Sequence, residues 1–218
     1  SIFEKLTHPG YYLTNPSMLA HELGHTFGLY HANLLDCGEN YIDEFQNCTP
    51  REYGDFLDAV GGPREGLPHY NAINKKIIGF INNDRITTVN TNGTYTINDV
   101  TNPTGPIALK ILKNQNAKGE PEDYYWIELK TTKPPFEQYM KKYATPNTPQ
   151  ITMYKKYKTP QTERGSLIID TNPTTNIATP QYYLEGLTPD FTFTDNNGIK
   201  IQTKQTNQNT ATIKIEYC

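Results

Sequence analysis

The chain has 218 residues, with 20 Lys and Arg against 23 Asp and Glu, and a formal net charge of −3. This near balance, without any block of basic residues, argues against nucleic acid or an anionic membrane surface as the partner. No apolar run approaches the roughly 18 residues of a membrane-spanning helix. We therefore expect a chain without a membrane span, long enough for one sizeable core or two modest ones.

The first predicted element is a helix that begins at Asn15-Pro16. Asparagine is a good N-cap, and proline suits the first helical position because its missing amide hydrogen costs nothing there. The helix carries an apolar face for packing, formed by Met18, Leu19, Leu23 and Phe27.

Residues 21–31 follow the spacing HExxHxxGxxH. His21 and His25 lie on one helical face and can bind one metal ion together, while Gly28 permits the sharp turn that returns His31. Three imidazoles with an open fourth position are typical of a catalytic zinc site, although iron or cobalt would also fit. Glu22 follows the first ligand and is the predicted general base towards a water at the metal.

This motif is the signature of the metzincin zinc endopeptidases, and the chain resembles the gametolysin family most closely within that group. The similarity continues in Glu52–Gly61, which reads EYGDFLDAVG, and in Tyr70–Phe80, which reads YNAINKKIIGF. The resemblance implies a secreted enzyme with zinc on His21, His25 and His31, Glu22 as the base, and a protein or peptide substrate outside the cell.

The chain departs from the family in two respects. Val60 stands where metzincins carry a methionine in a turn beneath the zinc; a branched apolar side chain should keep this packing floor while altering its fit. The family also has a sheet-containing subdomain of roughly a hundred residues before the zinc helix, whereas 20 residues precede His21 here. We expect the N-terminal subdomain to be lacking from this chain.

Several polar residues after the motif have more than one interpretation. Asp55 and Asp58 could orient a ligand imidazole, form a calcium site with Glu52, or be turn residues that face water. A tyrosine often assists in metzincins, and Tyr53 or Tyr70 could take that part. No spacing distinguishes the two.

The cysteines favour an oxidising compartment. Cys37 and Cys48 flank a polar loop that a disulfide would hold, and we predict that bridge. Cys218, the last residue, has no evident mate and could be free or paired outside this sequence.

From residue 83 the pattern changes to short runs of β-branched and aromatic residues, several of which alternate with period two. The predicted strands are Ile86–Val89, Thr94–Ile97, Ile107–Leu112, Tyr124–Leu129, Ser166–Ile169, Phe191–Thr194, Ile199–Thr203 and Ala211–Tyr217. Trp126 is predicted as a core anchor, with a carbohydrate or peptide platform as the alternative. Residues Thr145 to Arg164 are predicted as a long exposed loop.

The sequence thus predicts an α+β fold: a zinc helix, a Met-turn-like loop and a C-terminal helix in residues 1–82, and an antiparallel β-sandwich accessory domain in residues 83–218. The predicted function is that of a secreted zinc endopeptidase. The alternative is a non-catalytic binding or adhesive protein that zinc merely stabilises and that engages its partner through the β-sandwich.

Overall fold

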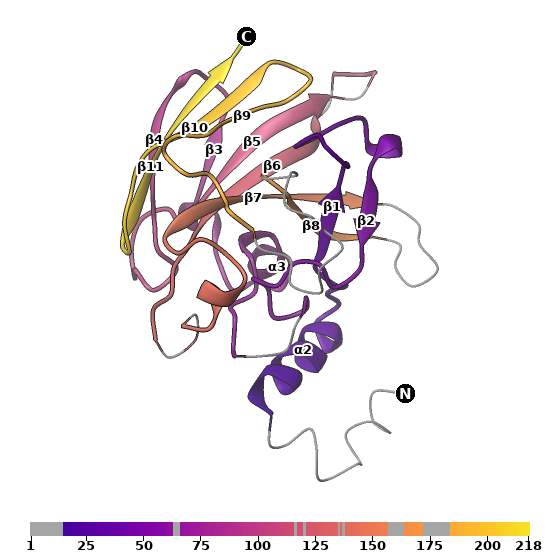
Figure 1. Ribbon diagram of the computed structural model, residues 1–218, viewed down its shortest axis with the longest axis vertical. Helices are drawn as coiled ribbons and strands as arrows, with labels where there is room; N and C mark the ends of the chain where they lie inside the picture. The colour runs from indigo at the N-terminus through magenta and orange to yellow at the C-terminus, as the bar shows by residue number, and fades with distance from the viewer. Residues whose placement is uncertain are drawn as a thin grey trace.

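A computed structural model of the chain describes residues 15–62, 66–115, 117–119, 121–134, 136, 138–156, 164–171 and 184–218. In these residues the fold is mostly β, with two sheets and two short helices (Figure 1). The helices are α2 (Pro16–Thr26) and α3 (Ala72–Ile77). The strands are β1 (Asn33–Asp36), β2 (Thr49–Arg51), β3 (Ile86–Val89), β4 (Gly93–Asn98), β5 (Ala108–Gln115), β6 (Pro121–Lys130), β7 (Thr148–Lys156), β8 (Arg164–Ile169), β9 (Thr192–Thr194), β10 (Ile199–Thr206) and β11 (Thr210–Tyr217).

The large sheet has seven strands in the order β2-β1-β8-β7-β6-β5-β3. It is mixed, because β1 pairs in parallel with β8, and β3 in parallel with β5. The prediction of a purely antiparallel sandwich is therefore wrong for this sheet. The division at residue 82 stays a prediction, but the large sheet draws strands from both sides of it, with Leu34 of β1 opposite Ile168 of β8.

The small sheet has four antiparallel strands in the order β4-β11-β10-β9. Its β11 alternates between buried and partly exposed residues, as expected for a strand with one face on a core. The main core lies between this face and the facing side of the large sheet. There the fully buried rings of Tyr125 and Phe193 meet edge to face, 5.4 Å between centroids. The predicted strands of residues 83–218 all appear in the two sheets.

The helical part of the fold is smaller than the metzincin resemblance implies. The predicted C-terminal helix is α3, which has only six residues, so the described residues do not form a metzincin helical core. The predicted apolar face of α2 is also only partly buried. Met18 is buried, but Leu19, Leu23 and Phe27 are 38%, 43% and 53% exposed. In the described residues no helix is long and apolar enough to cross a membrane.

The prediction of a loop over residues 145–164 is wrong for Thr148–Lys156, because these residues form β7, which lies between β6 and β8. Both faces of β7 are covered: Gln150, Ile151, Thr152 and Met153 are all at most 2% exposed. Polar and apolar residues do alternate over residues 150–153, but the Pro, Thr, Gln and Lys residues of the whole segment favoured a loop. Residues 157–163 lie outside the described part of the chain.

The predicted disulfide between Cys37 and Cys48 is present. It joins the end of β1 to the start of β2 and closes the intervening loop against the edge of the large sheet. Cys218 is exposed and is not in a disulfide with any described residue.

Candidate metal centre

Helix α2 begins and ends as its sequence predicts. The side chain of Asn15 accepts hydrogen bonds from the amides of Ser17 and Met18, at 3.1 and 3.3 Å, and so caps the helix. The helix ends at Thr26, and Gly28 follows with φ +87°. Apart from its two chain neighbours, no described residue has an atom within 4 Å of where a Cβ at Gly28 would be. Glycine is therefore needed at this position because the backbone is left-handed, and not because a side chain would clash with a neighbour.

The turn at Gly28 brings His31 back to the two histidines of the helix. One ring nitrogen from each of His21, His25 and His31 lies within 4.8 Å of the others, so the three side chains form a possible metal site. His21 is 1% exposed, and the other two are partly buried. His8 lies outside the described residues. His69 lies against Phe136, 5.1 Å between ring centroids, and is not part of this group.

Backbone carbonyls orient the two helical imidazoles. The Nδ1 of His21 lies 3.0 Å from the carbonyl oxygen of Ala59, and the Nδ1 of His25 lies 2.9 Å from that of Leu29. A carbonyl oxygen can only accept, so each Nδ1 carries the hydrogen and each Nε2 presents a lone pair. These two Nε2 atoms are 3.1 Å apart. Two lone pairs at this distance repel each other unless a cation binds between them, and this donor set therefore fits a metal ion.

A carboxylate orients the third imidazole. Oε1 of Glu52 lies 2.6 Å from Nδ1 of His31. Such a partner fixes the ring orientation and makes the other nitrogen a stronger donor to a metal. The sequence named Glu52 only as a calcium candidate, so this interaction was missed. Within the described residues, Glu52 does not form a possible metal cluster with Asp55 and Asp58.

Asp55 and Asp58 hold the backbone under the metal centre. They are 1% and 2% exposed, so the prediction that they face water is wrong. Asp58 accepts from the amides of Val60 and Asn71, at 2.7 and 2.6 Å, and Asp55 accepts from the amide of Leu57 at 2.9 Å. Among the described residues, their hydrogen-bond partners are backbone amides and asparagine side chains, and not the imidazole of a candidate ligand. Burial raises the pKa of Asp55 to about 7 and also raises that of Asp58.

Val60 lies against α2. It is fully buried with Leu29 and Ala32, and its carbonyl accepts a hydrogen bond of 3.1 Å from the Ala32 amide. The helix comes so close that a Cβ on Gly24 would lie 2.5 Å from Cγ1 of Val60. The carbonyl that orients His21 belongs to Ala59, the residue before Val60, so this turn both supports the helix and positions a ligand.

The two candidate tyrosines differ in position. The Tyr53 ring lies 4.0 Å from the His31 ring and 5.9 Å from the His21 ring, between centroids. Its φ of +60° is uncommon for a residue other than glycine. Tyr70 instead donates its hydroxyl to the carbonyl of Ala20 and thereby holds the α2 backbone. Tyr53 is therefore the tyrosine at the metal centre, and Tyr70 is a support of the helix.

Glu22 follows His21 on α2 and is partly buried.

Comparisons with family models, with curated proteins and with solved structures found no match for this chain. The interpretation of the site therefore rests on its own residues and geometry.

Proposed function

We propose that the protein is a zinc-dependent endopeptidase of the metzincin type that acts on proteins or peptides outside the cell. The observation that carries this proposal is the convergence of three imidazoles, each with its Nδ1 engaged, two of them on a helix that also bears Glu22 and the third from the loop after it. A site that serves only stability needs no acidic residue beside its ligands. The Cys37–Cys48 disulfide is typical of oxidising compartments and supports the extracellular location.

The chemistry that a bound zinc ion supplies is activation of water and polarisation of the scissile carbonyl. His21, His25 and His31 would hold it, and their partners Ala59, Leu29 and Glu52 keep the rings in place. Glu22 would accept the proton of the attacking water and pass it to the leaving amine nitrogen. Tyr53, packed against the His31 ring, would limit the movement of that ligand.

The test is metal content by elemental analysis together with cleavage of a denatured protein. We expect one zinc per chain, cleavage that a chelator abolishes, and a Glu22→Ala variant that keeps its zinc but loses activity. Glu39→Ala, at an exposed position outside the site, is the matched control and should cleave like the parent chain. Full cleavage by Glu22→Ala, or a chain that binds no metal, would contradict the proposal.

A non-catalytic binding protein is the second candidate, and one observation favours it. Strand β1 begins two residues after His31 and pairs with β8 in the large sheet, next to the edge strand β2. A metal at the histidines would therefore brace this sheet, whatever else it does. In this case Glu22→Ala would leave both function and zinc unchanged, and removal of the metal would lower the free energy of unfolding.

A further inference from the structure

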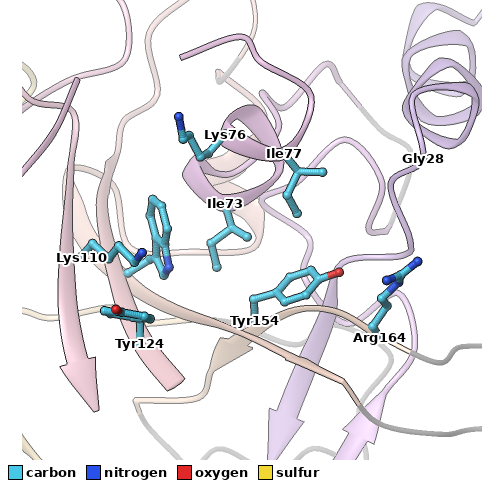
Figure 2. Close-up of a pocket in the computed structure, with 9 residues that line it drawn as sticks. Gly28, Ile73, Lys76, Ile77, Lys110, Tyr124, Tyr154 and Arg164 are labelled. Carbon is cyan, nitrogen blue, oxygen red and sulfur yellow. The ribbon is translucent and has the colours of Figure 1, made fainter. Parts of the chain in front are cut away.

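A cavity of about 430 Å³ lies between α3 and the outer face of the large sheet, away from the main core (Figure 2). Its floor includes the alternate residues Tyr124 and Trp126 of β6, with Lys110 of β5 directly opposite Trp126 in the sheet register. Ile73 and Ile77 of α3 form the opposite wall, and Gly28 of the metal-centre turn lies at its rim. The volume is in the range of small-molecule sites.

The walls of this cavity are flat and apolar. Three aromatic side chains from neighbouring strands line it, namely Tyr124, Trp126 and Tyr154. Trp126 is 8% exposed and packs with Ile73 and Ala108. It is therefore the core anchor that its sequence predicts, and it also presents part of its ring to the cavity. Aromatic and aliphatic walls of this kind suit a planar apolar group.

The charged groups of the cavity all have the same sign. Lys76, Lys110 and Arg164 line it, and no Asp or Glu is among the described residues that do. The Nζ of Lys110 lies 3.9 Å from the Tyr124 ring centroid and 5.6 Å from that of Trp126. No described carboxylate lies within ion-pair distance of Lys76 or Lys110. Burial, and then the charge of Lys76, lower the pKa of Lys110. Positive charge thus gathers here although the chain carries a net charge of −3.

We propose that this cavity binds an aromatic carboxylate, whose ring lies between α3 and the aromatic floor and whose carboxylate pairs with Lys76 and Lys110. An anion there relieves the repulsion between the two ammonium groups, and a buried charge-assisted hydrogen bond is stronger than one in water. A ligand without a charge leaves this repulsion in place. A ligand without a ring forgoes the apolar contact. The inference does not depend on the metal centre or on peptidase activity.

Trp126 allows a direct test, because it is the only tryptophan of the chain. Its fluorescence is followed during titration with 3-phenylpropionate, with the uncharged 3-phenylpropanamide, and with acetate. We expect a saturable change with 3-phenylpropionate and none at the same concentrations of the other two. An equal response to the amide would overturn the proposal, since charge recognition would then be absent.

Substitutions of the lining lysines test whether the fluorescence change comes from binding in the cavity. Lys110→Gln should weaken 3-phenylpropionate binding about tenfold, which corresponds to the loss of one charged hydrogen bond. Lys76→Gln, on α3, should weaken 3-phenylpropionate binding as well, and it is the variant to use if Lys110→Gln does not fold. The matched control is Lys113→Gln, on the same strand but lining a different hollow with Leu35 and Ile42, which should bind like the parent chain. Unchanged binding in both Lys76→Gln and Lys110→Gln would overturn the proposal.

Two further experiments test where the ligand binds and what kind of molecule supplies the carboxylate. Titration of the metal-loaded and the chelator-treated protein should give the same affinity; loss of binding on chelation would place the carboxylate at the histidines and overturn the proposal. A short peptide that ends in phenylalanine is then compared with its C-terminal amide. Competition by the free acid alone would identify a peptide C-terminus as a source, and competition by neither would restrict the cavity to small aromatic acids.

Discussion

Replacement of Gly24 by alanine tests how closely the metal-centre helix lies on the turn beneath it. An added Cβ would meet Cγ1 of Val60 at 2.5 Å and Cε1 of Tyr70 at 3.1 Å. Real Cβ atoms do not approach other atoms so closely, so one of the neighbours must move. Val60 is fully buried, and the Tyr70 hydroxyl is fixed to the Ala20 carbonyl, so neither side chain can move away freely.

The expected magnitude follows from two opposing contributions. An extra methyl in a close-packed core costs about 1–3 kcal/mol, whereas alanine is favoured over glycine inside a helix by about 1 kcal/mol. We therefore expect Gly24→Ala to lower the free energy of unfolding by about 1 kcal/mol. In a Val60→Ala background the 2.5 Å contact is gone, and only the looser contact with Tyr70 at 3.1 Å opposes the helix preference. The same substitution should then raise the free energy of unfolding, by at most about 1 kcal/mol.

The assay is urea unfolding of the parent, both single variants and the double variant, with the metal-bound state held constant. Thr26→Ala, exposed at the end of the same helix, is the control for helix preference and should have the same effect in both backgrounds. The reversal of sign for Gly24→Ala is the decisive result. If Gly24→Ala changed the free energy of unfolding equally in the parent and in the Val60→Ala background, the close approach of helix and turn would be refuted.

Three further predictions concern the surroundings of the site. Burial raises the pKa of Asp55 from 3.8 to about 7, so between these pH values the folded chain keeps a proton that the unfolded chain releases. The protonated carboxyl therefore stabilises the folded chain at low pH, by on the order of 4 kcal/mol at most. This stabilisation is lost as the pH rises from about 4 through 7. Asp55→Asn should therefore gain stability relative to the parent over this window in unfolding experiments, and a pH-independent difference would show that Asp55 titrates normally. Glu52→Gln should lower metal affinity about 10–100-fold in competition with a chelating dye, since the amide orients His31 less firmly; unchanged affinity would exclude that role. Replacement of both Cys37 and Cys48 by serine should lower the unfolding free energy by about 3 kcal/mol, and an unaltered urea midpoint would contradict this.

The cluster of three histidines could be predicted from sequence because its spacing is local. His21 and His25 are one helical turn apart, and Gly28 marks the place where the chain reverses. The partners of the ligands could not be predicted in the same way. The carbonyls of Ala59 and Leu29 have no side-chain signature, and the contact between Glu52 and His31 depends on how the intervening loop folds.

The strands that were predicted and those that were missed differ in burial. In β11, apolar and polar residues alternate because only one face lies on the core. In β1, all of Asn33–Asp36 is buried, and β2 is a short edge strand that contains Pro50. Neither segment shows an alternating pattern. The parallel pairings of β1 and β3 also depend on distant partners, and no local pattern encodes them.

The pairing of β1 with β8 also has a consequence for the order of assembly. Asn33 of β1, two residues from the third metal ligand, lies opposite Leu167 in the sheet. A nascent chain therefore exposes its complete histidine motif on the ribosome long before the strand that anchors this motif has been synthesised. Any metal bound at that time would sit on an unsupported helix and loop. Tight loading is expected only after β8 has joined the sheet, so metal uptake would report the completion of the fold.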